Sequence, residues 1–118
     1  ECREHPDRIA RGAYAIDIHY RGKGAEMTWP PPGRSYSIPY RCLLPRRLDG
    51  LLASGRCLSA THDALGALRV MALCMATGHA AGVAAALAAL RNQSPRTLPI
   101  ETLQDELRRQ GAILDAPA

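Results

Sequence analysis

The stretch GRCLSATHDALGALRVM at positions 55–71 joins a short apolar run to a long alanine-rich one. The run before it, LLASG at 51–55, is continuously apolar and ends on glycine, which predicts a buried parallel strand. After it the chain passes through small and polar residues and then enters a helix-forming segment. A strand, a Gly-Arg pair, a small-residue loop and a helix in this order are typical of α/β proteins.

The segments on both sides complete the predicted elements. On the C-terminal side, 67–90 predicts one long buried helix, and 100–111 predicts an amphipathic helix that ends at Gly111. On the N-terminal side, AYAIDIHY at 13–20 and YSIPYRCLL at 36–44 predict strands, and Pro39 indicates that the second lies at a sheet edge. The glycine- and proline-rich stretch between them, 21–35, predicts a long loop.

Composition sets the class of protein and of partner. The 118 residues fit one small domain, and the absence of Phe, with a single Trp, predicts a shallow core that another part completes. The net charge is +4, but the basic residues form no block longer than two. A nucleic-acid partner is therefore not expected, whereas the charge suits anionic small molecules. The polar start, ECREHPDRIARG, has no signal-peptide pattern and is expected to be a cut into a longer chain.

Cysteine spacing and the apolar segment exclude two further classes. The four cysteines are far apart with no C-x-x-C pair, so we expect no metal site and predict reduced thiols in a cytoplasmic protein. Residues 70–90 carry no charge and are long enough to span a bilayer. The abundance of alanine, the central His79 and the lack of aromatic belts favour a buried helix over a membrane span.

Several polar groups are candidates for chemistry. Asp17 and His19 are two residues apart on a strand and share a face, as a metal pair, an acid/base pair or an ordinary local hydrogen bond would. His62 lies beside Asp63 in the loop and is a candidate general acid/base. The chain has no G-x-S-x-G, no P-loop and no G-x-G-x-x-G, so a nucleophile elbow and a dinucleotide fingerprint are absent from it.

The loop and the helix start have a use of their own. Backbone N–H groups at a helix N-terminus favour an anion or a polarised carbonyl oxygen. Arg56 and Arg69 add positive charge at either end of the loop. Gly55 and Gly66 allow a flat ligand to approach the backbone closely.

The residues resemble a known family. YSIPYRCLLP at 36–45 and LDGLLASGRCLSATHDALGALRVMALCMATGHAAGVAAALA at 48–88 resemble the C-terminal part of FAD-dependent oxidoreductases of the large flavoprotein superfamily. The segment ARGAYAIDIH at 10–19 resembles the stretch in which such chains leave the substrate-side sheet, and 98–114 suits the family's final helix. The resemblance implies an α/β, Rossmann-like FAD/NAD(P)-binding flavoprotein, α+β when this piece is isolated, with two to three strands here. Residues 51–54 would be a late strand of the nucleotide-binding domain.

The same resemblance implies a division of labour and a set of contacts. Residues 1–50 would come from the substrate side and 51–118 would complete the FAD-binding domain, as one compact unit. The implied FAD contacts are Gly55, Arg56, Ser59, Gly66, Arg69, Val70 and Met71. The Gly-Arg pair would approach the diphosphate or ribityl chain, and 66–71 the N1/O2 edge of the isoalloxazine. Tyr40 and Arg41 would lead back toward the cofactor and substrate, and His62 would lie beside the reactive edge. His62 and Arg41 are the catalytic candidates.

Because the dinucleotide fingerprint is not in this chain, the resemblance implies only part of an FAD site. The expected partners are the remainder of the FAD-binding domain and a small-molecule substrate, and the chain alone is not expected to be a complete catalyst. The alternative is a stand-alone interaction module that dimerises through its alanine helix. Exposed apolar surface would favour homo-oligomers in either case. An in-frame G-x-G-x-x-G upstream in the gene would favour the enzyme.

Overall fold

The described residues form two small antiparallel sheets and three α-helices, so the expected mixed α+β class is confirmed. The structure, a computed structural model, describes residues 2–22 and 24–116. Its elements are β1 (Arg8–Gly12), β2 (Ile16–Tyr20), β3 (Gly24–Thr28), β4 (Tyr36–Pro39), α1 (His62–Leu68), α2 (Met71–Leu90) and α3 (Ile100–Arg109), with 3-10 turns η1 (Tyr40–Leu43), η2 (Gly55–Cys57) and η3 (Pro95–Thr97).

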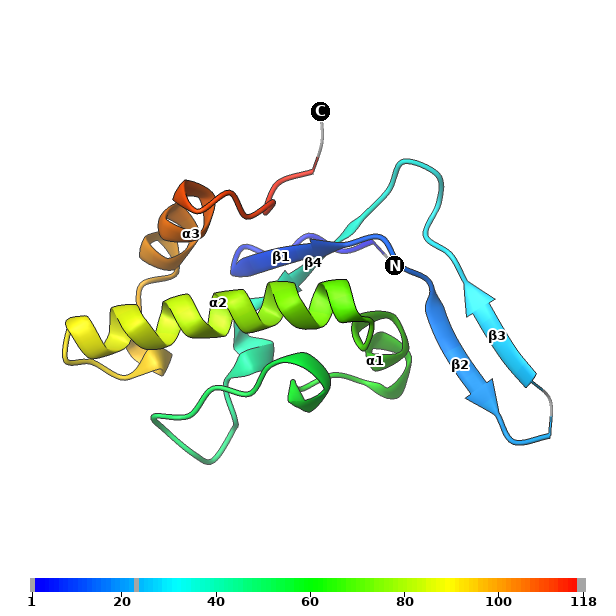
Figure 1. Ribbon diagram of the computed structural model, residues 1–118, viewed down its shortest axis with the longest axis horizontal. Coiled ribbons are helices and arrows are strands. Elements are labelled where there is room, and N and C mark those ends of the chain that lie inside the picture. Colours follow the sequence, from blue (N-terminus) through cyan, green and yellow to red (C-terminus); the bar gives the residue numbers. More distant parts are fainter. Residues whose placement is uncertain (1, 23, 117–118) are drawn as a thin grey trace.

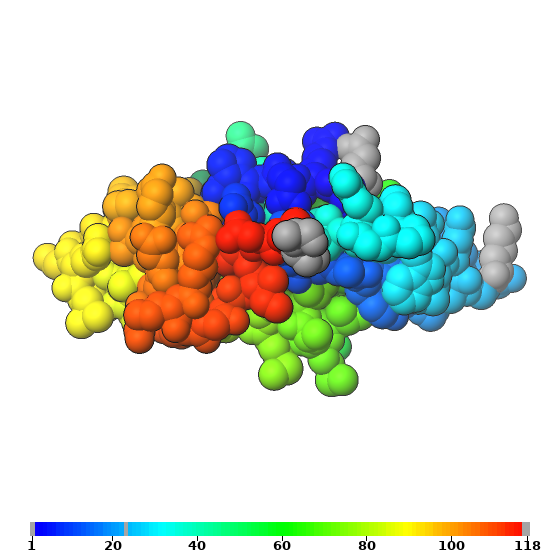
Figure 2. All heavy atoms as spheres, turned by 90° about the horizontal axis from the view of Figure 1, so that it is seen from above, coloured from blue at the N-terminus to red at the C-terminus, as the bar shows by residue number. Residues whose placement is uncertain are grey.

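The molecule is built around α2, which runs along its length (Figure 1). The β1–β4 sheet and α3 pack on this helix, α1 lies beside its first turn, and the β2–β3 hairpin projects beyond that end (Figure 1). The whole is elongated and flat, with extents of 50 × 36 × 20 Å (Figure 2). The hairpin contacts α1, so α1 connects the projecting hairpin to the rest of the fold.

The sheets differ from the sequence prediction in two ways. β1 pairs with β4, with an irregularity between Arg8 and Ala10, and β2 pairs with β3 from Ile16↔Thr28 to Tyr20↔Gly24. The described residues therefore form four strands rather than two to three, and the predicted loop 21–35 contains β3. All five residues of β3 are exposed, so this strand lacks the apolar alternation by which strands are identified.

The predicted parallel strand at 51–55 is wrong. Residues 51–54 join neither sheet of the described chain, although the Ala53 N–H donates to the Leu43 carbonyl at 2.8 Å. A parallel strand needs a neighbouring strand to pair with, and none of the four strands lies in that position. The predicted strand at 36–44 is correct only as far as Pro39, after which the chain turns into η1.

The predicted single helix at 67–90 is broken at Arg69 and Val70. Thr61 caps α1, its Oγ1 accepting a hydrogen bond from the Ala64 N–H at 3.3 Å, and α1 ends at Leu68. Val70 is extended, with ψ 151°, and α2 begins at Met71. The break follows from packing, because α1 lies on β2 while α2 lies on β1.

The core lies between α2, α3 and the β1–β4 sheet. One face of α2 is buried, through Leu73, Thr77, Ala80, Val83, Ala84 and Ala88. Leu103 and Leu107 of α3 are fully buried against it. The predicted end of α3 is confirmed: Gly111 has φ +85°, its N–H donates to the Arg108 carbonyl at 2.9 Å, and the Ala112 N–H donates to the Leu107 carbonyl at 2.9 Å.

The long helix is buried along one face only, which corrects the expectation of a buried helix. The side chain of Met71 is 78% exposed and that of Leu90 is 85% exposed. The first turns of α2, in light green, stand out from one side of the molecule in Figure 2. α2 is also long and apolar enough to cross a membrane, with a mean hydropathy of 1.6, but a single such helix is weak evidence because core helices have the same composition.

Candidate functional site

The Gly-Arg turn is fixed to α2 by hydrogen bonds. Gly55 has φ +61°, and its N–H donates to Thr77 Oγ1 at 3.1 Å. Thr77 is fully buried and its hydroxyl donates to the Leu73 carbonyl at 2.9 Å. Arg56 Nε donates to the Arg69 carbonyl at 3.4 Å. The Gly-Arg turn and the start of α2 therefore lie side by side, although Arg56 and Arg69 are 13 positions apart in sequence.

The N-terminus of α2 is uncapped and open. Val70 makes no side-chain hydrogen bond to the helix, and the first turn has no acidic residue. The Cys74 N–H donates to the Val70 carbonyl at 3.0 Å, so the N–H groups of Met71, Ala72 and Leu73 precede the first intrahelical bond. Such an end attracts a negative charge or a polarised oxygen.

Arg69 connects this corner to the hairpin. Its Nη2 donates to the Asp17 carbonyl at 3.1 Å and to Asp17 Oδ2 at 3.0 Å. His19 Nε2 lies 3.3 Å from Asp17 Oδ1, so Asp17 and His19 share a face, as predicted. Gly66 is buried against the same strand, and a Cβ there would lie 2.9 Å from the Asp17 carbonyl oxygen. Asp17 is thus held at once by Arg69 and His19.

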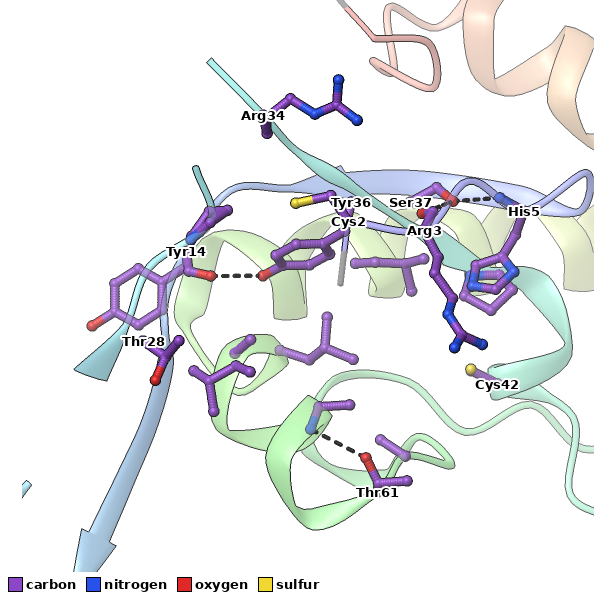
Figure 3. A pocket seen from close by; sticks show the side chains of 18 of the residues that line it. Cys2, Arg3, His5, Tyr14, Thr28, Arg34, Tyr36, Ser37, Cys42 and Thr61 are labelled. Atoms are coloured by element: carbon purple, nitrogen blue, oxygen red, sulfur yellow. Dashed lines mark hydrogen bonds between the residues drawn. The ribbon is translucent and has the colours of Figure 1, made fainter. Parts of the chain in front are cut away.

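A pocket of about 990 Å³ lies between the β1–β4 sheet, the base of the β2–β3 hairpin and residues 59–68. Figure 3 shows Arg3, His5, Tyr36 and Ser37 on its sheet side and Thr61 facing them. Of the predicted site residues, Arg41 and Ser59 line this pocket, while Gly55, Arg56, His62, Gly66, Arg69, Val70 and Met71 do not. The predicted residues therefore fall into two neighbouring groups.

Arg41 is held at the pocket wall by two partners. Its Nη1 forms an ion pair with Asp7, and its backbone N–H donates to Asp7 Oδ2 at 3.2 Å. Its Nη2 lies 3.0 Å from His5 Nδ1. Because a guanidinium only donates, Nδ1 of His5 is the acceptor and the ring proton lies on Nε2.

Two further polar groups of the pocket, the hydroxyl of Tyr36 and the thiol of Cys42, are neutral. Tyr36 donates its hydroxyl to the Tyr14 carbonyl at 3.1 Å, and burial raises the pKa of Tyr36 to about 12. Burial also raises the pKa of the Cys42 thiol, against the opposing effect of Arg41. The phenol and the thiol therefore stay protonated at neutral pH.

Comparison with known protein families identifies the family of this chain. Residues 1–107 match the family described as FAD dependent oxidoreductase. The chain belongs to the FAD-dependent oxidoreductases. Comparison with the curated proteins and with the solved structures found no match. The family confirms the resemblance noted in the sequence, and it implies FAD in the complete protein.

The residues of this FAD-dependent oxidoreductase fit such a cofactor at the start of α2. The open N–H groups of an uncapped, exposed helix end suit the polarised oxygen of a flavin ring. The adjacent Gly55 has no side chain of its own, and its Cβ position faces the Cys74 side chain at 3.6 Å. His62, the first residue of α1, is exposed and lies outside the pocket.

Sequence reasoning missed most of the pocket of this oxidoreductase. His5, Tyr14, Trp29 and Arg34 line it and come from segments far apart in the chain. One signal was present: the single tryptophan of the sequence stands directly before three prolines. The four cysteines are free thiols, and no group of three or more His, Cys, Asp or Glu side chains within 2–22 and 24–116 is arranged to hold a metal.

Proposed function

We propose that this chain supplies one wall of the FAD site in a flavin-dependent oxidoreductase. In this proposal the first turn of α2 faces the N1/O2 edge of the isoalloxazine. The observation that carries it is the pairing of an uncapped, exposed helix start with the Gly55–Arg56 turn through the Arg56–Arg69 hydrogen bond. The family match supports the choice of FAD as the ligand.

Each residue of this wall has a proposed role. The backbone N–H groups after Val70 stabilise negative charge on the reduced ring. Gly55 lets the cofactor approach the backbone, and Arg56 binds the diphosphate or ribityl chain. Arg69 positions the corner by binding Asp17. When bound, FAD supplies two-electron redox chemistry toward a small-molecule substrate.

The other predicted site residues lie outside this wall or act through packing. Ser59 lies on the loop between the Gly-Arg turn and α1, where it lines the pocket next to the proposed cofactor. Gly66 acts through packing, because it allows α1 to lie against Asp17. His62 and Arg41 keep their proposed places beside the reactive edge and the substrate.

The rest of the FAD site belongs to a part that carries the dinucleotide fingerprint, which the printed sequence lacks. We propose that this Rossmann-like part covers the exposed apolar face of α2 around Met71 and Met75. Residues 51–118 then complete its FAD-binding domain and 1–50 face the substrate. The 118 residues alone are not a complete catalyst. We also propose a cytoplasmic location, with no nucleic-acid or membrane partner.

The same exposed face favours one alternative, a non-catalytic module that associates with a second copy of itself. The two proposals differ in their response to FAD. In a dimerisation module the Gly-Arg turn does not contact FAD. Substitutions in this turn would then cause no change in FAD binding.

The test is the FAD dissociation constant of the complete protein, measured by flavin fluorescence, with Arg56→Ala and with Arg91→Ala as the control. Both arginines are exposed, but Arg91 follows the far end of α2. Loss of a charge-assisted contact of about 1.5–3 kcal/mol predicts affinity weaker by about 10- to 150-fold for Arg56→Ala. Arg91→Ala is expected to bind like the parent.

Equal affinities for the two variants would contradict the proposed contact. A second measurement tests the need for the missing wall: the 118-residue chain alone is expected not to bind FAD tightly. Stoichiometric quenching of flavin fluorescence by this chain would show that it needs no second wall.

A further inference from the structure

We propose that Asp17 is a positioning residue of the flavin site: its carboxylate balances the charge of Arg69 and so helps to set the reduction potential of the bound FAD. This role rests on the proposed function, because it requires the flavin to lie at the start of α2. The pairing of Asp17 with His19 along the strand is compatible with several roles. The contact with Arg69 selects this one.

Two contacts to the same residue hold the guanidinium of Arg69. Its Nη2 donates to the Asp17 carbonyl at 3.1 Å and to Asp17 Oδ2 at 3.0 Å. One acceptor belongs to the backbone and the other to the side chain, so a neutral side chain at position 17 would still leave the backbone contact. The backbone of Asp17 is itself fixed, because α1 packs so closely on it that a Cβ at Gly66 would lie 2.9 Å from its carbonyl oxygen.

The Asp17 carboxylate lies on the side of β2 that faces the start of α2. Ile16 lines the pocket on the other side of this strand, whereas Asp17 does not. Successive side chains of a strand alternate between its faces, which turns Asp17 toward Arg69. Arg69 follows the last residue of α1, and Val70 and Met71 come directly after it. In Figure 1, α1 lies between the hairpin and the first turn of α2.

Charge at this corner acts on the flavin because the reduced ring is more negative at its N1/O2 edge than the oxidised ring. A cation nearby therefore raises the reduction potential and an anion lowers it. Arg69 and Asp17 form an ion pair without net charge, so each conceals the effect of the other. Their side chains are 40% and 19% exposed, and the field of either charge alone would be only partly screened by water.

Two other ionisable groups contact this pair. His19 Nε2 lies 3.3 Å from Asp17 Oδ1, and Arg56 Nε donates to the Arg69 carbonyl at 3.4 Å. Within 2–22 and 24–116, Asp17 is the one carboxylate that pairs with Arg69. Removing its charge therefore leaves the guanidinium of Arg69 uncompensated.

The experiment measures the reduction potential of FAD in the complete protein, at about pH 8.5, where histidine side chains are uncharged. Asp17→Asn keeps the carbonyl that binds Arg69, and it is expected to raise the equilibrium constant of flavin reduction about tenfold, or by about 30 mV. Arg69→Gln leaves the carboxylate alone and is expected to lower this constant by a similar factor. The double variant removes both charges and is expected to return close to the parent potential.

Asp115→Asn is the matched control, because it removes the same charge from an ion pair outside the proposed FAD wall. It is expected to leave the potential unchanged. A merely structural role for Asp17 predicts that both single variants lower the melting temperature but leave the potential at the parent value, or move it in the same direction. Either result would overturn the proposal, and so would an equal shift in the control. If Arg69→Gln does not retain FAD, the comparison of Asp17→Asn with Asp115→Asn decides.

The location of the flavin is tested separately by Met71→Glu, which adds a charge without touching this ion pair. A potential lowered by Met71→Glu but unchanged by Asp17→Asn would overturn the role of Asp17 and leave the proposed function in place. A potential that none of these substitutions changes would contradict both.

Discussion

At the residue scale, the site depends on the backbone conformation at position 55, which a glycine adopts without strain. Its φ of +61° turns the chain so that its N–H reaches the buried hydroxyl of Thr77. The Thr77 hydroxyl in turn donates a hydrogen bond to the helix backbone, so it has hydrogen-bond partners although the residue is fully buried. A single glycine and a single threonine therefore hold the Gly-Arg turn against α2.

Gly55→Ala is expected to lower the free energy of unfolding by about 1–2 kcal/mol, because a Cβ is strained at positive φ. Gly78→Ala is the matched control: Gly78 lies within α2 with nothing near the new methyl group, so the change is expected to stabilise by about 0.5–1 kcal/mol. Urea denaturation followed by circular dichroism measures both. The prediction fails if the two variants shift stability in the same direction.

At the element scale, local patterns predicted those features that local sequence determines. The amphipathic face of α3 and its glycine end were correctly placed, since both depend on neighbouring residues. The shared face of Asp17 and His19 follows from the period of a strand. The partner of Asp17, Arg69, was not foreseen, because 52 residues separate them and no local pattern encodes their contact.

The errors at this scale have a common cause. The break at Arg69 and Val70 is invisible in a run of helix-forming residues, because it arises from the different strands on which α1 and α2 pack. The apolar run at 51–55 looks like a buried strand, but a strand requires a neighbour that these residues do not have in the described chain. The pocket was missed for the same reason, since its walls come together only in the fold.

At the scale of the whole molecule, the ion pair of Asp115 with Arg8 joins segments that are distant in sequence, and three further carboxylate ion pairs join near neighbours along the chain. Asp115 binds Arg8 of β1 and Arg108 of α3, and Glu4 binds Arg11. Hydrogen bonds from Arg8 and then Arg108 hold the pKa of Asp115 below its ordinary 3.8. Hydrogen bonds from Arg109 and Gln110 lower the pKa of Glu106 to about 2.

The lowered pKa values of Asp115 and Glu106 predict that the fold loses stability in acid. A carboxyl group whose pKa is lower in the folded state stabilises the fold above its unfolded pKa, and this contribution is lost as the pH falls through the folded value. The melting temperature is therefore expected to fall below pH 4.5, the ordinary value for Glu106, and to continue falling toward about pH 2. Asp115→Asn is expected to make this fall shallower. A melting temperature independent of acid pH, measured by circular dichroism, would contradict the prediction.

The role proposed for α2 is tested by two charge substitutions in the complete flavoprotein. Met71 and Leu90 stand at opposite ends of this helix, and both are largely exposed. Met71→Glu and Leu90→Glu therefore add the same charge at matched exposure, one at the proposed flavin and one at the far end.

The most direct measurement is the reduction potential of the bound flavin in these two variants. Placing a carboxylate beside the N–H groups that stabilise the reduced ring is expected to lower the potential by about 20 mV, which corresponds to about 1 kcal/mol for a two-electron couple. Leu90→Glu is expected to leave the potential at the parent value. A potential that Met71→Glu does not change, or that both variants change equally, would contradict the placement of the flavin at the start of α2.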